Sequence, residues 1–401
     1  MNLAKLLFIS YSVTIAYFMG EDAKNWLLIG CMAIVSVLYA AWLSKLSIDK
    51  KDFLFLCLLL AMSFCAIRHW ASFRISSFGY SVLFVLSFLY IKKTIENGRI
   101  DFSWSYKIFG YLIYVYAIVL MIQQMCVLTG IPVFNSALSA YDESQFKLPS
   151  LCPEASHLAP MEVFLMLGHI VMREIKSGVK YSFDNIKKEK GVWFCYFWVM
   201  LTSMSTTAML YSIIPLVRFV KVKNLGIYLC LIGVFLLIMG MWFSDNVAFI
   251  RMLNIIPAIL SFDPFIIDTI DHSAAYRILP VIGFFEHINV FSLNFWLGEG
   301  MDYGKIYFNQ YIFFYSGDGT YNEFDGVNVG GFASYIMDYG MVCFLLMIVA
   351  FRRVIGNMKD KYLILVRCVL NVFSGFNMQI FWFSAVVCLV LNHYSKCYIR
   401  S

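Results

Sequence analysis

The sequence contains little charge and none of the short motifs that mark soluble metal or redox proteins. Charged residues make up 14% of the 401 residues, and 61% of the residues are hydrophobic. A soluble domain has about 25% charged and about 45–50% apolar residues. The chain also lacks a CxxC pair, a zinc-type His/Cys spacing, internal repeats and low-complexity tracts. The low charge excludes a water-soluble domain. The missing Cys and His spacings give no support for a zinc or dithiol centre.

The excess of apolar residues is arranged in runs, and a run of about 20 apolar residues crosses the hydrocarbon core of a membrane as a helix. We therefore predict an all-α, polytopic integral membrane protein with about twelve transmembrane helices, forming a single domain over residues 1–401. Two of the runs, 191–204 and 207–220, are also compatible with one broken helix or a tight hairpin. The predicted spans are 4–20, 26–44, 53–67, 76–91, 109–127, 158–172, 191–204, 207–220, 225–243, 330–351, 362–376 and 379–392.

Lys and Arg are concentrated in alternate loops, and this pattern predicts the orientation of the chain. With the N-terminus in the cytoplasm, most of the 31 Lys and Arg residues lie in cytoplasmic loops, among them the Lys-rich loop 173–190. This distribution agrees with the positive-inside rule. Both termini then face the cytoplasm, and the net charge of +6 is explained without nucleic acid as a partner.

The largest interruption of the apolar pattern, residues 244–329, falls between the ninth and tenth spans on the outer side. Within it, Val247–Leu260 and Tyr276–Leu297 are apolar enough to form helices that lie on the outer face or dip into it. The rest is rich in Gly, Asp and aromatic residues, which indicates turns. So much polar chain on one face suggests a site that acts on something delivered in the outer leaflet.

Glu154 is the first candidate for chemistry, and it precedes the span that opens near Leu158. Pro160 is tolerated only in a first helical turn, so we expect the helix to start near Ser156. Glu154 and His157 would then lie at headgroup depth beside a helix N-terminus, which attracts phosphate. A partly buried carboxylate can take a proton from an alcohol. The alternative is that Glu154 only caps the helix.

Arg277 is the second candidate, because it begins an apolar segment on the outer side. A guanidinium group binds phosphate oxygens in bidentate fashion and stays charged at low dielectric. It could instead be an interfacial anchor that pairs with lipid headgroups or with Asp271. Arg251, next to a similar apolar stretch, has the same two interpretations.

Three ionisable residues fall in or near predicted spans, where charge is costly and indicates either function or mutual pairing. Glu162 and Asp338 belong to the outer halves of their spans, so the two could border one cavity. Arg367 could be their structural partner, and structural pairing is favoured over catalysis.

Three further features each allow two interpretations. The hydroxyl groups of Ser203–Thr207 could bind sugar, or satisfy a backbone break within the membrane, which is favoured. The aromatic residues of 303–324 could stack on sugar rings or form an interfacial belt. Cys126 and Cys152 could pair, although free thiols are favoured.

Four stretches of the sequence resemble segments of the O-antigen and exopolysaccharide repeat-unit polymerases, the Wzy-type family. They are similar to that family's Glu-Pro-Ser-type segment, its arginine-bearing outer segment, its Gly-x-Gly turn and its late span with a Tyr-Gly pair. The first stretch has Ala155 where Pro is common in the family. Some members of the family have a Gly ten residues after an Arg, and neither Arg251 nor Arg277 is followed by such a Gly. The stretches are Pro153–Ala159, Ser273–Arg277, Leu297–Gly300 and Val329–Met341.

The resemblance implies a glycosyltransferase of the bacterial inner membrane, multi-pass, with both termini cytoplasmic. Such enzymes move a growing glycan from undecaprenyl pyrophosphate onto a sugar hydroxyl of a new lipid-linked repeat unit, on the periplasmic face. Glu154 would then be the base for the acceptor hydroxyl, and Arg277 would stabilise the departing charge. The residues expected to bind substrate are Arg251, His157, Tyr276, Glu299 and Asn328.

The resemblance also implies the partners of the protein, and it leaves rival functions open. We expect an undecaprenyl-pyrophosphate-linked oligosaccharide as substrate, the bilayer as medium, and a chain-length regulator and a flippase as possible associates. Neither a cofactor nor a metal is needed if arginine supplies the positive charge. An O-antigen ligase has a similar architecture. A flippase or transporter of lipid-linked oligosaccharide would show paired repeats and midplane charges, which the sequence lacks.

Overall fold

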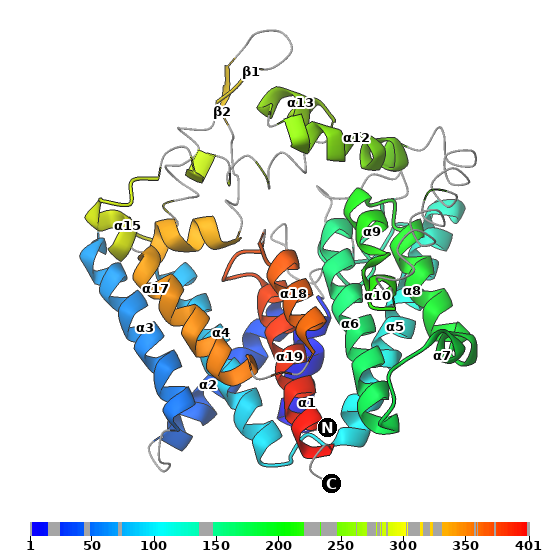
Figure 1. The fold of residues 1–401 in the computed structure, drawn as a ribbon, viewed down its shortest axis with the longest axis horizontal. Helices are drawn as coiled ribbons and strands as arrows, with labels where there is room; N and C mark the ends of the chain where they lie inside the picture. Colours follow the sequence, from blue (N-terminus) through cyan, green and yellow to red (C-terminus); the bar gives the residue numbers. More distant parts are fainter. Residues whose placement is uncertain are drawn as a thin grey trace. The chain divides into compact units, whose positions relative to one another are not determined.

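The computed structural model is helical, apart from one short antiparallel pair of strands among the residues it describes (Figure 1). The all-α prediction is therefore confirmed in its coarse form. The structure describes residues 2–14, 25–43, 49–70, 74–135, 147–219, 233, 247–261, 263–270, 278, 281, 283–285, 288–301, 303, 313–315, 321–323, 331–356, 358, 360–372 and 374–398.

The elements follow one another along the chain with few long connections in the first half. The helices there are α1 (Leu3–Ser12), α2 (Trp26–Leu43), α3 (Lys50–Arg68), α4 (Ile75–Glu96), α5 (Phe102–Thr129), α6 (Ala155–Ser177), α7 (Phe183–Lys188), α8 (Lys190–Thr202), α9 (Thr206–Tyr211) and α10 (Ile214–Val217). The elements of the second half are α12 (Val247–Ser261), α13 (Pro264–Ile270), α15 (Leu293–Leu297), β1 (Phe313–Tyr315), β2 (Tyr321–Glu323), α17 (Gly331–Ile355), α18 (Lys361–Leu370) and α19 (Gln379–Tyr398).

Among the described residues, five helices are long and apolar enough to cross a membrane, which indicates a membrane protein. They are α4, α5, α6, α17 and most of α19. Their ends follow local signals. Asp101 caps α5 by accepting a hydrogen bond from the Trp104 amide at 2.6 Å, and Gly130 ends the helix in the left-handed conformation at φ 71°.

In the described residues, α1 and α18 end before the first and the eleventh predicted spans do. The prediction placed a helix over 4–20, whereas α1 ends at Ser12. The side-chain amide of Asn25 donates to the carbonyl oxygens of Ser10 at 3.2 Å and Val13 at 2.9 Å, and so satisfies groups that end α1. Likewise α18 ends at Leu370, because Asn371 caps it.

The structure has a break after the seventh predicted span, which was one of the alternatives for this region. Ser203 ends α8, Met204 has φ 52°, and α9 begins after Ser205. The Thr202 carbonyl accepts a hydrogen bond from the side-chain amide of Gln124 at 3.2 Å. The hydroxyl of Ser203 is buried and has no hydrogen-bond partner among the residues that the structure describes. A glutamine of α5, rather than this serine, therefore satisfies the broken backbone.

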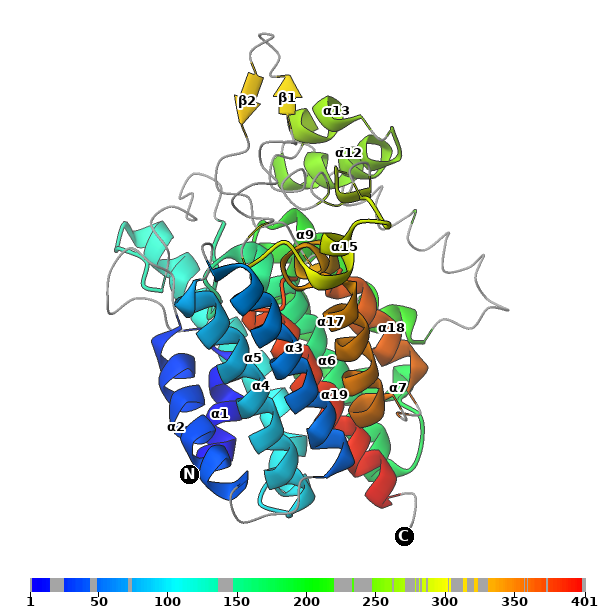
Figure 2. The ribbon, with the colours of Figure 1, turned by 90° about the vertical axis from the view of Figure 1, so that its left-hand side faces the viewer.

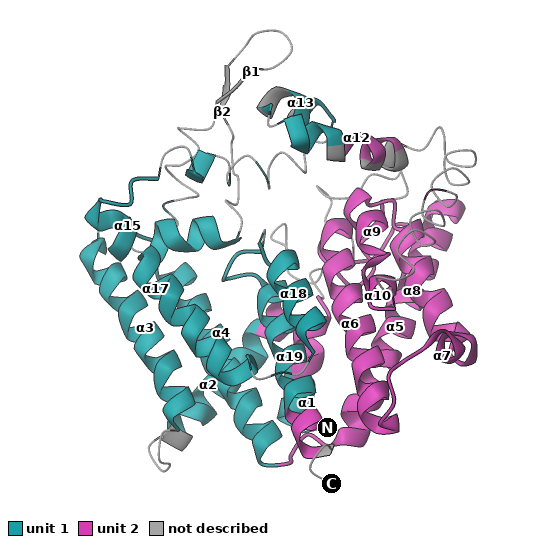
Figure 3. Cartoon of the chain, viewed as in Figure 1, with its two compact units in different colours: residues 1–7, 29–97, 257–392 teal, residues 8–28, 98–256, 393–401 magenta. Residues whose placement is uncertain are grey.

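The chain divides into two compact units, each assembled from separate stretches of sequence (Figure 3). Unit 1 comprises Met1–Leu7, Ile29–Asn97 and Pro257–Asn392, and unit 2 comprises Phe8–Leu28, Gly98–Ile256 and His393–Ser401. In unit 2, α6 is buried almost throughout and packs against α5, α8 and α9. Gly168 of α6 lies against Phe109 of α5, so closely that a Cβ there would come within 2.6 Å of the ring.

In unit 1, α3 packs against both α4 and α17, as two views show (Figures 1 and 2). A cluster of fully or nearly fully buried rings joins them to α19. The ring of Trp382 stacks on Phe84 with centroids 5.7 Å apart, and Phe55 meets Phe351 edge-on at 5.3 Å. Aromatic rings in such geometries add specific attraction to the area that they bury.

A buried ion network closes the end of α4 in unit 1. The Lys92 ammonium, 1% exposed, lies 2.7 Å from the Asp52 carboxylate and 3.2 Å from Glu96. Lys93 also pairs with Asp52 at 3.1 Å. Because both Lys92 and Asp52 are fully withdrawn from solvent, each depends on the other for charge compensation.

A second network holds the segment after α6 in unit 2. Glu189 accepts from the Tyr181 hydroxyl at 2.7 Å, lies 3.1 Å from His169, and pairs with Arg173 at 3.0 Å. Burial alone raises the pKa of Glu189, but the hydrogen bonds from His169 and Tyr181, with the charge of Arg173, hold that pKa below its ordinary value of 4.5.

Candidate functional site

The candidate site in unit 1 is built around a break inside α17. Gly340 has φ 85° and ψ 163° within this helix, a conformation that is essentially restricted to glycine. A Cβ on Gly340 would lie 2.4 Å from the Trp296 carbonyl oxygen and 2.5 Å from the Gly298 amide nitrogen. Position 340 therefore requires glycine for two reasons, namely its backbone conformation and the close approach of another segment.

The break frees two carbonyl groups of α17 for bonds outside the helix. The Met337 carbonyl accepts from the Glu299 amide at 2.7 Å, and the Asp338 carbonyl accepts from the Gly300 amide at 3.3 Å. The Cys65 thiol of α3 also donates to the Asp338 carbonyl, at 3.0 Å. The segment that follows α15 is thus hydrogen-bonded to the broken helix, and this fixes the backbone at Glu299.

The side chain of Glu299 is held by a chain of hydrogen bonds that leads to α3. The Asn294 amide nitrogen donates to Glu299 Oε2 at 2.6 Å, and the Asn294 amide oxygen accepts from Arg68 Nη2 at 2.5 Å. Arg68 also donates to the Gly298 carbonyl at 3.1 Å. Because a guanidinium group only donates, it forces the oxygen of Asn294 toward itself and the nitrogen toward Glu299.

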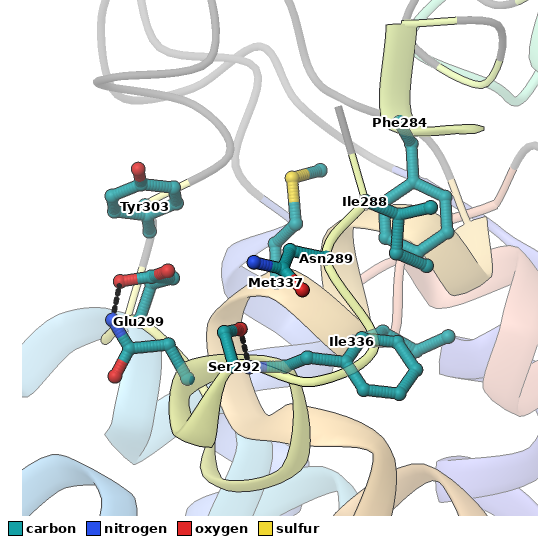
Figure 4. A pocket seen from close by; sticks show the side chains of 10 residues that line it. Phe284, Ile288, Asn289, Ser292, Glu299, Tyr303, Ile336 and Met337 are labelled. Atoms are coloured by element: carbon teal, nitrogen blue, oxygen red, sulfur yellow. Dashed lines mark hydrogen bonds between the residues drawn. The ribbon is translucent and has the colours of Figure 1, made fainter. Parts of the chain in front are cut away.

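A cavity of about 330 Å³ lies beside this chain (Figure 4). Its floor belongs to an apolar cluster in which α13, Phe284 and α17 meet. Ser292 shapes one wall, because its hydroxyl accepts from the Phe295 amide at 3.0 Å and caps α15. The lining residues are Phe284, Ile288, Asn289, Ser292, Asn294, Phe295, Glu299, Tyr303, Ile336 and Met337.

Glu154 occupies the position directly before α6 in unit 2. The helix begins at Ala155, one residue from the predicted start, and Pro160 lies inside it. The Glu154 carboxylate makes no capping bond to the helix backbone; it accepts a hydrogen bond from the Ser156 hydroxyl at 2.9 Å. Glu154 is exposed and His157 half-buried, so the structure differs from the partial burial expected for the carboxylate.

The segment that leads to Glu154 is anchored to α5. The Ser150 hydroxyl donates to the Tyr116 carbonyl at 2.7 Å, and Gln123 bonds both the amide and the carbonyl of Ser150. Burial raises the pKa of the Cys152 thiol to about 12, so this thiol stays protonated at neutral pH. Cys126 and Cys152 are both free, as favoured.

The other predicted site residues are placed only in part. Arg251 lies in α12 and is half-buried; the helix itself, Val247–Ser261, confirms the prediction for that stretch. Arg277, Tyr276 and Asn328 lie outside the described residues. Their roles remain predictions.

The ionisable residues of the predicted spans make different contacts from those expected. The Arg367 guanidinium lies 4.6 Å from the centre of the Phe351 ring and donates to the Ser384 hydroxyl at 3.3 Å. Within the described part of the chain, neither carboxylate oxygen of Glu162 has a hydrogen-bond partner. For Asp338, the side chain accepts from Ser334 at 3.3 Å.

Arg68 and Asn294 were not identified as site residues from the sequence, whereas Glu299 was. Arg68 showed only as one basic residue of an outer loop. Its contact with Asn294 joins residues 226 positions apart, and no local pattern indicates such a pairing.

Glu299 in unit 1 and Glu154 in unit 2 are the predicted site carboxylates that have a defined hydrogen-bond partner. The carboxylate of Glu299 can accept hydrogen bonds from hydroxyl groups, and that of Glu154 can take a proton. Among the described residues, no group of three or more His, Cys, Asp and Glu side chains could hold a metal ion. Comparison of the chain with protein-family models, curated proteins and solved structures gives no match.

Proposed function

We propose that this chain polymerises lipid-linked oligosaccharide repeat units into O-antigen, capsule or exopolysaccharide in the bacterial inner membrane. In this proposal the chain crosses the membrane about twelve times, both termini face the cytoplasm, and residues 244–329 form a periplasmic segment between the ninth and tenth spans. Five long apolar helices, the Lys/Arg distribution and the four stretches that resemble Wzy-type polymerases support it.

The observation that carries the proposal is the cavity beside Gly340. Of the ten described residues that line it, eight come from the segment 244–329, which the charge distribution assigns to the outer side. Its walls combine a carboxylate, amides and a phenol with apolar side chains. Hydroxylated rings require this combination, because their hydroxyl edges need hydrogen-bond partners and their C–H faces need apolar contact.

The proposed reaction transfers the growing glycan from one lipid carrier to a new repeat unit. A hydroxyl oxygen of the new unit forms a bond to the anomeric carbon of the growing chain. The bond from that carbon to the pyrophosphate oxygen breaks, and undecaprenyl pyrophosphate leaves with the electron pair. Glu154 takes the proton of the attacking hydroxyl.

Positive charge is needed where the pyrophosphate departs, and the proposal assigns it to arginine. Arg277 and Arg251 stabilise the developing negative charge by donating to phosphate oxygens. His157, Glu299 and Asn328 orient the sugar. Tyr276, the neighbour of Arg277 in the sequence, also binds substrate. A flippase supplies the substrate and a chain-length regulator acts on the product.

A deletion strain of the source bacterium distinguishes this function from its rivals. Loss of a polymerase leaves surface glycan with a single repeat unit. Loss of a ligase leaves no glycan on the lipid A core, and loss of a flippase traps the precursor in the cytoplasm. Electrophoresis of extracted lipopolysaccharide or capsule separates these outcomes, and only the first one agrees with our proposal.

Complementation of that strain tests the residues. Glu154→Gln and Arg277→Ala should each abolish chain extension at unchanged membrane abundance. The matched controls are Glu143→Gln and Lys305→Ala, which remove the same charges from the same predicted outer segments and should extend normally. Wild-type polymer lengths in either site variant would remove that residue from the mechanism.

A cysteine-labelling experiment tests whether residues 154 and 277 lie on the same, outer side of the membrane. Single cysteines introduced at positions 154 and 277 should both react with a membrane-impermeant maleimide added outside the inner membrane. Protection of one position until the membrane is opened would contradict the proposed mechanism.

A further inference from the structure

The chemical character of the cavity beside Gly340 limits what it can bind. Among the described residues that line the cavity, Glu299 is the only one that carries a charge, and that charge is negative. Phosphate and pyrophosphate are therefore repelled, since like charges at short range are unfavourable. A neutral ligand rich in hydroxyl groups, or a cationic one, fits the lining.

Arg68 is not among the described residues that line the cavity. Two of its N–H groups donate to the Gly298 carbonyl and to the amide oxygen of Asn294. Its effect on the cavity is indirect: by binding the oxygen of Asn294, it aims the nitrogen at Glu299 Oε2.

This arrangement leaves the second oxygen of the Glu299 carboxylate as an acceptor. Within the described residues, Oε1 accepts no hydrogen bond, whereas Oε2 is held by Asn294. Figure 4 shows Glu299 and Tyr303 on one side of the cavity, with Phe284 and Ile288 on the opposite side. A ligand with a hydroxylated edge and an apolar face can satisfy both sides at once.

The size of the cavity selects a single ring. Its volume of about 330 Å³ lies at the lower end of ligand-binding sites. One six-membered sugar ring with its hydroxyl groups fits this volume.

We propose that the cavity is a subsite for one pyranose ring of a neutral or amino sugar, with Glu299 Oε1 accepting from its hydroxyl or amino groups. Arg68 is a positioning residue that acts through Asn294. The pyrophosphate of the lipid carrier binds elsewhere. The choice of a sugar as ligand rests on the proposed function, whereas the size and charge preference rest on the cavity alone.

Saturation-transfer NMR on the full chain in nanodiscs tests the subsite. The probes are methyl glucoside, galactoside, rhamnoside, N-acetylglucosaminide and glucosaminide, with inorganic pyrophosphate as competitor. At least one pyranoside should receive saturation, and pyrophosphate should not displace it. Absence of saturation for every pyranoside, or displacement by pyrophosphate, would overturn the proposal.

Variants assign the binding to this cavity. Glu299→Gln should weaken the best pyranoside at least tenfold, and Ile288→Trp, which fills the cavity, should abolish its saturation. Using two variants guards against one that does not fold, and thermal unfolding identifies it. Unchanged binding in a folded Ile288→Trp protein would place the sugar elsewhere and overturn the assignment.

The role of Arg68 is tested by measuring whether its effect on pyranoside binding depends on Glu299. Arg68→Met should weaken pyranoside binding in the wild-type chain but have no further effect in the Glu299→Gln background, because both act through one carboxylate. Arg74→Met, which removes an arginine just before α4, is the matched control and should bind normally. A purely structural role would give equal losses in both backgrounds and refute positioning.

Failure of this inference is distinguishable from failure of the proposed function. Normal polymer in the deletion strain rejects the polymerase, and the binding experiment still decides whether the cavity takes a pyranose. Blocked polymer with no pyranoside binding rejects the subsite and leaves the polymerase standing.

Discussion

Replacing Gly340 with alanine tests whether the break in α17 depends on glycine. In the native structure Gly340 has φ 85° and ψ 163°. A Cβ at this position would lie 2.4 Å from the Trp296 carbonyl oxygen and 2.5 Å from the Gly298 amide nitrogen, so an alanine methyl group cannot occupy this space. The chain must either hold a strained conformation or move the segment after α15 away from α17.

The magnitude follows from the contacts that are lost. Holding a non-glycine residue in this conformation costs about 1–3 kcal/mol. The two hydrogen bonds from Glu299 and Gly300 to the broken helix contribute about 0.5–1.5 kcal/mol each. Either alternative costs at least about 1 kcal/mol, so at about 2–4 °C per kcal/mol we expect Tm to fall by at least about 2 °C. The same variant should lose pyranoside binding, because the backbone at Glu299 is released.

Intrinsic tryptophan fluorescence during heating of the purified protein in detergent measures this change. The matched control is Gly79→Ala in α4, where an added Cβ meets no atom within 4 Å. Alanine is favoured over glycine there by about 0.5–1 kcal/mol, so Tm should stay the same or rise. A Gly340→Ala protein with wild-type Tm and wild-type sugar binding would refute our account of the break.

Three further predictions concern stability, each read as Tm of the purified protein. Lys92→Met should lower the free energy of unfolding by about 3–5 kcal/mol, because it leaves the Asp52 carboxylate buried with less charge compensation. Lys93→Met should lower it less, because the Lys93 side chain is 21% exposed whereas that of Lys92 is 1% exposed. Equal losses would contradict the buried network. Asp101→Ala should cost about 1 kcal/mol by removing the cap of α5, and Asp101→Asn should restore most of it. The pKa of Glu189 in the folded protein lies below 4.5, so the stabilisation by its carboxylate is present above pH 4.5 and is lost on acidification. The wild-type protein should therefore have a higher Tm than Glu189→Gln at neutral pH, and this difference should disappear at low pH. A difference independent of pH would argue against the ion network.

The positions of the helices were largely accessible from the sequence, because apolar runs and their ends are local signals. The predicted span 26–44 corresponds to α2 (Trp26–Leu43), and 158–172 lies within α6 (Ala155–Ser177). The predicted count of about twelve spans remains a prediction, as does the single domain. The prediction continued the first helix to residue 20, whereas α1 ends at Ser12 and residues 15–20 lie outside the described part; this end depends on Asn25, whose side-chain amide reaches back to the carbonyls of Ser10 and Val13.

The site was accessible only in part. Glu299 stood out as an acid between two glycines in an outer segment, and it lies at the cavity. The break at Gly340 gave no signal, since a glycine within an apolar run is compatible with an unbroken helix. Its conformation becomes necessary only when the segment after α15 packs against it. The orientation of Asn294 by Arg68 depends equally on tertiary contact.

The hydrogen bond from the Cys65 thiol to the Asp338 carbonyl has a practical consequence. The sulfur also lies where a Cβ on Gly298 would come within 2.9 Å, so an alkylating reagent can reach it only after the Gly298 segment separates from α17. In a chain whose other cysteines are replaced, the rate of Cys65 alkylation would therefore report how often the cavity wall opens. Slowing of that rate by a bound glycoside would show that the wall closes around its ligand.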